Sequence, residues 1–125
     1  MHKFIEDIEK TISASAIILS SNIQKFFGPN NETVYLKGTL ILIDSSILEI
    51  SIFASKSHNA VLIEKYRFHF RDKHGQMIFR YDNAPHHHEI PSYPHHKHIE
   101  SCITASSSPN LKNVLNEIST IILRR

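Results

Sequence analysis

Residues 66–81, with the sequence YRFHFRDKHGQMIFRY, predict a β-hairpin and thereby decide the fold class. On both sides of the turn, aromatic residues alternate with mostly basic residues, which is the pattern of a strand with one buried face. Asp72 and Gly75 suit the first and fourth positions of a type I turn followed by a glycine bulge. The hairpin therefore places its aromatic side chains on one face and its arginines on the other.

The same turn predicts a register in which Phe68 lies opposite Phe79 and Arg67 lies opposite Arg80. Like charges directly opposite each other destabilise a sheet, so two facing arginines favour a bound anion such as phosphate. A solvated outer face, with both arginines extended into water, explains the same pattern without a ligand. The remaining pairs of this register are Phe70 with Met77, Tyr66 with Tyr81, Lys65 with Asp82, and His69 with Ile78.

Apolar residues at helical spacing predict one helix at each end of the chain, over residues 3–14 and residues 111–122. The second helix is predicted to begin with Ser108 as its N-cap and Pro109 at its first helical position. Residues 124–125 are arginines, whose charge suits the C-terminal end of that helix.

Runs of β-branched and aromatic residues, bounded by turn-forming residues, predict the strands between the helices. Residues 34–43 are apolar on both faces, which favours a central strand buried on both sides. The expected strands are residues 17–27, 34–43, 47–54, the hairpin reached by a strand that begins at Val61, and 95–103. We therefore predict one α+β domain over residues 1–125: an N-terminal helix, an antiparallel meander of about five or six strands, and a C-terminal helix.

The composition is that of an ordinary soluble protein, with 41% hydrophobic and 21% charged residues in a chain of 125. No apolar run is long enough to span a membrane, and acidic residues interrupt the N-terminal stretch that a signal peptide would need. Cys102 is the single cysteine, which fits a reducing cytoplasm, and we interpret it as an ordinary strand residue. A formal charge of +2 does not by itself indicate nucleic-acid binding.

Histidine is unusually dense, with ten in the chain and six of them between residues 86 and 98. One interpretation is a site for a divalent metal such as zinc, because imidazole is a common ligand. The spacing matches neither a zinc finger nor the H-E-x-x-H pattern, so a cofactor is not favoured. The alternative ligands are His86, His88, His96 and His98.

The favoured interpretation is acid–base chemistry on RNA. Cleavage through the ribose 2′-hydroxyl needs a base, an acid, and cations for the phosphorane, and histidine suits both proton roles. We assign proton transfer to His96 and His98, with His69 as a third candidate. Asp82 would orient a histidine or an arginine. Phosphate binding is assigned to Arg67, Arg80 and Lys97.

The motif FRYDNAPHH at residues 79–87, followed by PHHKH at residues 94–98, resembles the TumE-type toxins of toxin–antitoxin modules. The hairpin strand YRFHF at residues 66–70 also matches that family. The resemblance implies a small toxin silenced by a cognate helix-turn-helix antitoxin. It adds Asn83 to the RNA-binding candidates. The positions carried over are Arg80, Asp82, Asn83, His86, His87, His95, His96 and His98.

We thus expect a cytoplasmic toxin that acts on RNA as a metal-independent ribonuclease. Two alternatives remain open at this point: a metal-dependent nuclease or hydrolase that uses the histidines, and a non-catalytic module whose arginine face binds RNA or an acidic protein. The sequence leaves open whether the chain forms a homodimer.

Overall fold

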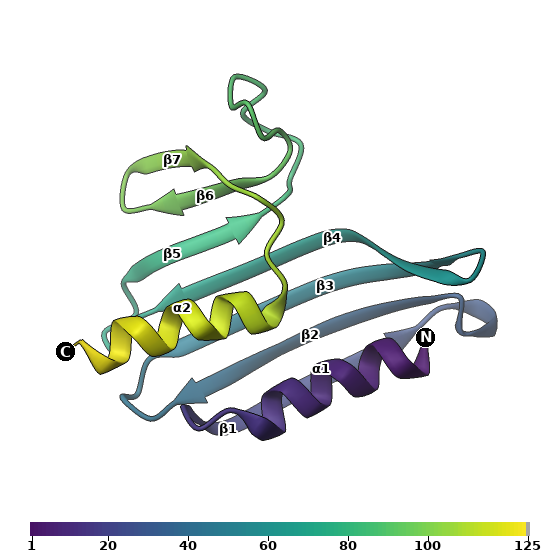
Figure 1. Ribbon diagram of the computed structural model, residues 1–125, viewed down its shortest axis with the longest axis horizontal. Coiled ribbons are helices and arrows are strands. Elements are labelled where there is room, and N and C mark those ends of the chain that lie inside the picture. The colour runs from purple at the N-terminus through teal and green to yellow at the C-terminus, as the bar shows by residue number, and fades with distance from the viewer. Residues whose placement is uncertain (125) are drawn as a thin grey trace.

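The computed structural model describes residues 1–124 and has the expected α+β architecture (Figure 1). Within these residues, an antiparallel meander of seven strands is preceded by one α-helix and followed by another, and the strand order in the sheet is the order in the sequence. A short 3-10 helix, η1 (Pro29–Asn31), connects the first two strands. The elements are α1 (His2–Ala14), β1 (Ile18–Phe27), β2 (Thr33–Leu42), β3 (Ile47–Ser57), β4 (Ala60–Arg71), β5 (Met77–Asp82), β6 (His96–Ile99), β7 (Cys102–Ala105) and α2 (Leu111–Leu123).

The strand count exceeds the predicted five or six because residues 95–103 do not form one strand. They contain β6 and the start of β7, which pair with each other across a tight turn. Glu100 in this turn has a φ of 50°, in the left-handed region that lets the chain reverse within a few residues. The alternating pattern of residues 95–103 continues through the β6–β7 turn, so the pattern alone does not show that the chain reverses there.

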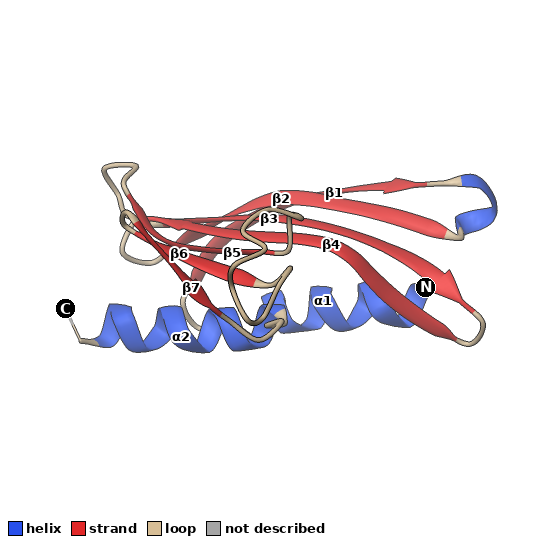
Figure 2. Ribbon diagram, turned by 90° about the horizontal axis from the view of Figure 1, so that it is seen from above, coloured by secondary structure: helices blue, strands red, loops and turns tan. Residues whose placement is uncertain are grey.

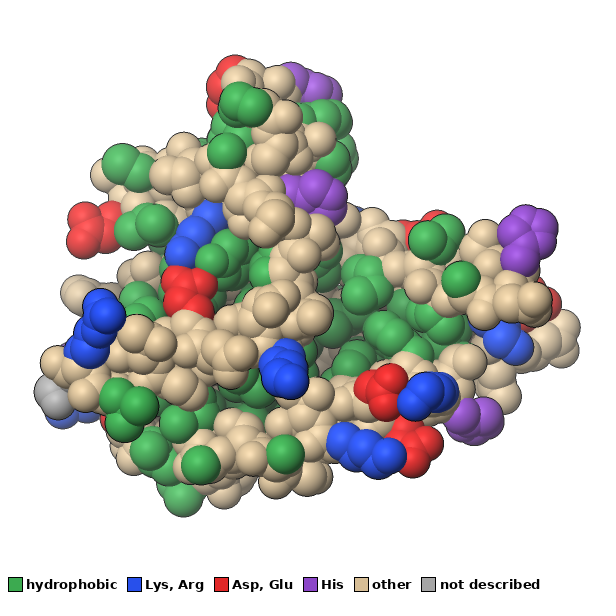
Figure 3. Space-filling view, in the orientation of Figure 1, with side chains coloured by type: hydrophobic (Ala, Val, Ile, Leu, Met, Phe, Trp, Pro, Cys, Tyr) green, Lys and Arg blue, Asp and Glu red, His purple; other side chains and the backbone are tan. Residues whose placement is uncertain are grey.

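Both helices lie on the same face of the sheet (Figure 2). Buried side chains from β2, β3, β4 and β5 meet α1 and α2 on this helix-covered face, and hydrophobic side chains gather between the helices when the molecule is viewed from that side (Figure 3). Among residues 1–124, no helix covers the opposite face, which we call the open face.

The prediction that residues 34–43 are buried on both sides is therefore wrong. Leu36 and Leu40 point to the helix-covered face and are buried, whereas Tyr35, Lys37 and Ile41 are exposed on the open face. The apolar residues on both sides of this strand reflect an exposed apolar surface rather than a second core.

The hairpin turn is confirmed, but its register differs from the prediction by two residues. Gly75 has a φ of 84° and its N–H donates to the Asp72 carbonyl at 2.9 Å, as in a type I turn with a glycine bulge. The bulge pairs Asp72 with Gln76, and a second bulge between Phe70 and Arg71 adds another residue. Because the total shift is two, the side chains from Arg67 to Phe70 and from Phe79 to Tyr81 stay on their predicted faces. At the bulge the shift is one, so Met77 lies opposite Arg71 and Ile78 packs against the core.

The corrected register removes the pair of facing arginines. Arg67 lies opposite Asp82, and His69 lies opposite Arg80. Like-charge repulsion between Arg67 and Arg80 therefore gives no argument for a bound anion, and any anion site has to be argued from the three-dimensional arrangement.

The start of α2 also differs from the prediction. Asn110, rather than Ser108, caps the helix: its side chain accepts a hydrogen bond from the Asn113 N–H at 2.8 Å, and the Asn113 side chain accepts from the Asn110 N–H at 3.1 Å. Pro109 therefore precedes the cap. Arg125 lies outside the described residues. Over residues 1–124, neither helix has the length and apolar character needed to cross a membrane.

Candidate functional site

The sheet register aligns the predicted polar residues in two neighbouring rows on the open face. In one row Asp82 lies between Arg67 and His96 on the adjacent strands. In the next, Arg80 lies between His69 and His98. Strand pairing thus gathers residues from β4, β5 and β6 that are as many as 31 positions apart in the chain.

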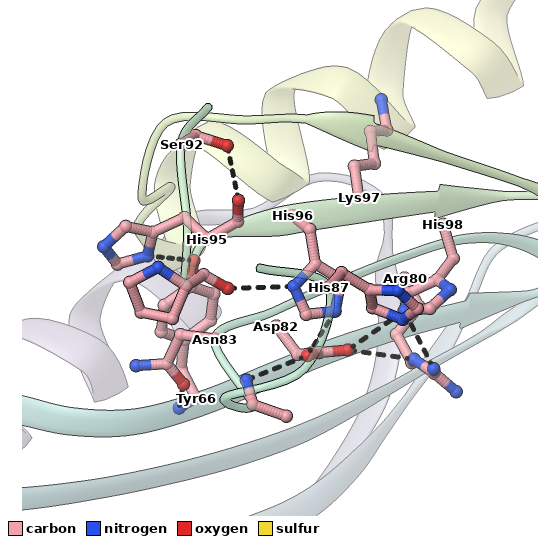
Figure 4. A network of polar contacts seen from close by, with 12 residues as sticks. Tyr66, Arg80, Asp82, Asn83, His87, Ser92, His95, His96, Lys97 and His98 are labelled. Carbon is pink, nitrogen blue, oxygen red and sulfur yellow. Dashed lines mark hydrogen bonds and ion pairs between the residues drawn. The ribbon is translucent and has the colours of Figure 1, made fainter. Parts of the chain in front are cut away.

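Asp82 is the centre of this cluster (Figure 4) and is only 6% exposed. One carboxylate oxygen, Oδ1, accepts from His96 Nε2 at 2.8 Å and from the Ala84 N–H at 3.1 Å. The other, Oδ2, accepts from Arg80 Nε at 3.1 Å and lies 3.5 Å from His98 Nε2. A buried carboxylate with this many donors is held in one position.

His96 has an acceptor at each ring nitrogen. Its Nδ1 lies 2.8 Å from the carbonyl oxygen of Pro94, and its Nε2 lies 2.8 Å from Asp82. A carbonyl oxygen has no proton to give, and an ionised carboxylate has none either. Each ring nitrogen of His96 therefore faces an atom that can only accept a hydrogen bond.

His98 has the opposite environment. Its Nε2 lies 3.0 Å from Nη2 of Arg80, and an arginine only donates, so this nitrogen accepts and is unprotonated. Burial lowers the pKa of His98 below its usual value, and the positive charge of Arg80 lowers it further. The cluster therefore pairs a histidine whose ring nitrogens both face acceptors with one whose Nε2 faces a donor.

A third histidine comes from the loop between β5 and β6. His87 has a φ of 61°, an uncommon conformation for a residue other than glycine, and its ring centroid lies 5.3 Å from that of His96 and 6.0 Å from that of His98. One ring nitrogen from each of the three lies within 4.8 Å of the others, a spacing that a metal ion could bridge. Among the described residues, the predicted ligands His86 and His88 do not belong to this group, and His88 stacks on Tyr93 instead.

A cleft of about 410 Å³ opens over the cluster. Besides the histidines, its lining includes Lys65 and Arg67 from β4, and Tyr35 and Phe53 from β2 and β3. The site thus combines the Asp82-centred cluster with cations and aromatic rings.

The structure does not bring Lys97 to this cluster. Lys97 points to the helix-covered face, away from His96 and His98 (Figure 4), and its Nζ lies 2.6 Å from Oε2 of Glu117 on α2. Burial lowers the pKa of Lys97, but hydrogen bonds to Glu117 and Tyr81 outweigh that effect, so its pKa is raised overall. Its predicted role in phosphate binding does not fit this position.

Asn83 and His95 have partners of their own. The Asn83 side chain accepts from the Tyr66 N–H at 3.0 Å and donates to the Glu64 carbonyl at 3.1 Å, which ties the loop to β4. His95 Nδ1 lies 2.9 Å from the Tyr66 hydroxyl. Both residues hold the loop that carries His87, and neither lines the cleft.

His69 lies on the open face beside the cluster but does not line the cleft. Within residues 1–124 its Nε2 is buried without a hydrogen-bond partner, and burial lowers the pKa of His69. This environment also keeps His69 neutral.

Sequence reasoning missed Tyr35 and Phe53 because they come from strands that carry no histidine motif. The only sign in the sequence that they lie on the open face is that they alternate with buried residues of the same strands. His87 was known only through the family resemblance, since no local pattern fixes the direction of a loop side chain.

A helix-covered antiparallel meander whose open face carries an Asp–His–Arg cluster defines a small α+β protein with a polar site in a cleft of its sheet. The chain matches the family described as Toxin TumE over residues 7–124, and it therefore belongs to the TumE toxin family. Membership implies the toxin role of a toxin–antitoxin module and hence an antitoxin partner. Searches of curated proteins and of solved structures found no match.

Proposed function

We propose that this toxin cleaves RNA at the Asp82-centred cluster, without a metal ion. The observation that carries the proposal is the pairing of His96, whose ring nitrogens both face acceptors, with His98, whose Nε2 faces Arg80, in a cleft that also contains Arg67. Ribose-assisted cleavage needs this combination of acid, base and cation.

In the proposed reaction, Arg80 turns from His98 to the phosphate, and Nε2 of His98 then accepts the proton of a ribose 2′-hydroxyl. The 2′-oxygen attacks the adjacent phosphorus, and the bond from phosphorus to the 5′-oxygen breaks. The Nε2–H of His96 turns from Asp82 to that leaving oxygen and gives it the proton, so that the products are a 2′,3′-cyclic phosphate and a free 5′-hydroxyl. Arg80 and Arg67 stabilise the negative charge of the phosphorane. Asp82 positions His96 and compensates its charge.

Purified protein incubated with total RNA in excess chelator tests the proposal. We expect cleavage by the parent, and a large loss of cleavage in His98→Gln. His88→Gln is the matched control because His88 is exposed and stacks on Tyr93, outside the cluster. Intact RNA at every pH from about 5.5 to about 8 contradicts the metal-free mechanism.

A second candidate, a metal-dependent nuclease, is favoured by the three histidines His87, His96 and His98. Nδ1 of His87 lies 3.3 Å from Glu89, which leaves its Nε2 for a ligand, whereas a metal at Nε2 of His96 would have to displace the contact of that nitrogen with Asp82. Three imidazoles are a common donor set for catalytic zinc, which would activate a bound water.

His87→Gln distinguishes the two candidates, because His87 has no proton-transfer role in the metal-free mechanism. A metal site predicts that this variant loses both bound metal and cleavage, whereas the metal-free mechanism predicts that cleavage persists. Elemental analysis of tag-free protein gives the first readout. Less than about a tenth of an equivalent of metal excludes the second candidate.

We further propose that the antitoxin is of the helix-turn-helix type and acts by closing the cleft. Adding one equivalent of the antitoxin encoded beside this chain should stop RNA cleavage. If His98→Gln still arrests growth and still binds RNA, a non-catalytic binding module replaces both nuclease candidates.

A further inference from the structure

A row of aromatic side chains crosses the open face next to the cluster. Strand register places Phe26 beside Tyr35, Tyr35 beside Phe53, and Phe53 beside Lys65, on four consecutive strands. Phe26 is 57% exposed and Tyr35 is 38% exposed. Exposed aromatic residues aligned in this way are uncommon on a surface that has no partner.

These rings are held in defined orientations. The Tyr35 hydroxyl lies 3.0 Å from Oγ of Ser51, and the ring meets Phe26 edge to face with centroids 6.3 Å apart. Because the tyrosine is fixed at its hydroxyl end, its face is available for stacking with little loss of side-chain entropy.

Basic residues accompany the aromatic row. Lys65 ends it, and the next row places Lys37, Ser51 and Arg67 side by side. Across residues 1–124, none of these three cations forms an ion pair, whereas the nearby acid Glu49 is paired with Arg71. This part of the open face is therefore positively charged and complements a polyanion.

The aromatic row and the basic residues beside it are continuous with the proposed catalytic cluster. Tyr35, Phe53 and Arg67 line the same cleft as Asp82, and Phe53 is two strands from Asp82, or roughly 10 Å. A second hollow of about 170 Å³, lined in part by Gln24, Lys37 and Arg67, continues across the sheet.

We propose that the open face is a binding platform for single-stranded RNA, which leads the strand into the cluster. Bases stack on Phe26, Tyr35 and Phe53, and phosphates lie on Lys65 and Arg67. Only unpaired bases offer free faces to aromatic side chains, because a duplex already stacks its bases on each other. This inference rests on the proposed function, since it names the substrate class of the same site.

Binding of a fluorescein-labelled, 2′-O-methylated single-stranded RNA, followed by fluorescence anisotropy, tests the platform. The methyl group blocks cleavage, so that affinity is measured alone. We expect Phe26→Ala and Tyr35→Ala each to weaken binding about tenfold, because each removes one stacking contact. Tyr35→Phe should bind as the parent does, and the same RNA as a duplex should bind more weakly.

Phe27→Ala is the matched control. Phe27 is 46% exposed and pairs with the buried Val34, so it lies on the helix-covered side of the same strand. Its removal should leave RNA affinity unchanged. Unchanged affinity in Phe26→Ala and Tyr35→Ala, or a preference for the duplex, overturns the platform.

Cleavage of total RNA separates this inference from the proposed function. If the parent cleaves RNA while the aromatic variants bind and cleave as it does, the platform is wrong and the cleavage proposal stands. If the aromatic variants lose binding but the parent never cleaves RNA, the platform stands and the cleavage proposal is wrong. If they lose antitoxin binding while RNA affinity is unchanged, the surface belongs to the protein partner and the platform is overturned.

Discussion

The two faces of the sheet use alternate residues of the same strands for different purposes. On the helix-covered face, Phe68 and Phe79 are nearly fully buried in the core. One residue away, Arg67 and Arg80 stand on the open face beside the cleft. Because side chains alternate along a strand, stability and chemistry are assigned to different residues of one hairpin.

β6 gives the sharpest case of this difference. His96 and His98 point to the Asp82 cluster, whereas Lys97 between them points to Glu117 on α2. Three successive residues of one motif therefore serve two unrelated sites. A basic residue in a family motif is not for that reason a ligand for the substrate.

The largest expected effect is on the helix-covered face. Phe68→Ala removes a ring that is 2% exposed, and we expect it to lower the free energy of unfolding by about 3–5 kcal/mol. Urea denaturation followed by circular dichroism measures this change. Phe26→Ala on the open face should cost less than about 1 kcal/mol, since its ring is already largely solvated. Equal losses in the two variants would break the comparison.

The next effect is on the open face. His98→Gln should reduce the rate of RNA cleavage by about 10²-fold or more, because it removes the proposed base. Its urea midpoint should stay near that of the parent. The same variant should relieve the growth arrest that the parent causes when it is expressed in a bacterial host. His74→Gln, at an exposed position in the β4–β5 turn, should change neither property.

Replacing one basic residue on each face of the sheet, Lys97 and Arg67, compares the two faces directly. Lys97→Met leaves Glu117 without its ion-pair partner and should cost about 1–2 kcal/mol of stability, with RNA affinity unchanged. Arg67→Gln should leave stability unchanged and reduce the slope of log affinity against log salt by about 1. A weaker RNA affinity in Lys97→Met would return Lys97 to the binding site.

Alternation in the sequence was sufficient to predict which face the hairpin residues occupy, except for Met77 and Ile78 at the bulge. It could not predict the register, because the bulge after Phe70 depends on packing rather than on a local residue type. The error changed which residues face each other, so that Arg67 lies opposite Asp82 instead of Arg80. The face that a side chain occupies follows from the local alternation of residues. Which residues of two strands lie opposite each other depends also on every bulge between them and the turn.

The candidate site shows the same division. His96, His98 and Asp82 were predicted together, and strand alternation already placed Lys97 on the other side from the two histidines. The position of His87 depends on a loop, and the aromatic row depends on pairing among β1, β2 and β3. Such contacts between distant segments have no signature in the motif itself.

The smallest expected effect concerns pH and again belongs to the open face. Burial lowers the pKa of His98 and of His69 in the folded protein, while the unfolded chain has ordinary histidine values near 6.5. As the pH falls below about 6.5, the unfolded state therefore takes up protons before the folded state does, and the folded state loses stability. We expect the melting temperature to fall between about pH 7 and about pH 5, and to fall less in His98→Asn than in the parent. His74→Asn, which changes a solvent-exposed ring, should follow the parent. A parent melting temperature that stays constant or rises over this interval would mean that the open face does not hold His69 and His98 neutral, and the assignment of His98 as the base would lose its physical support.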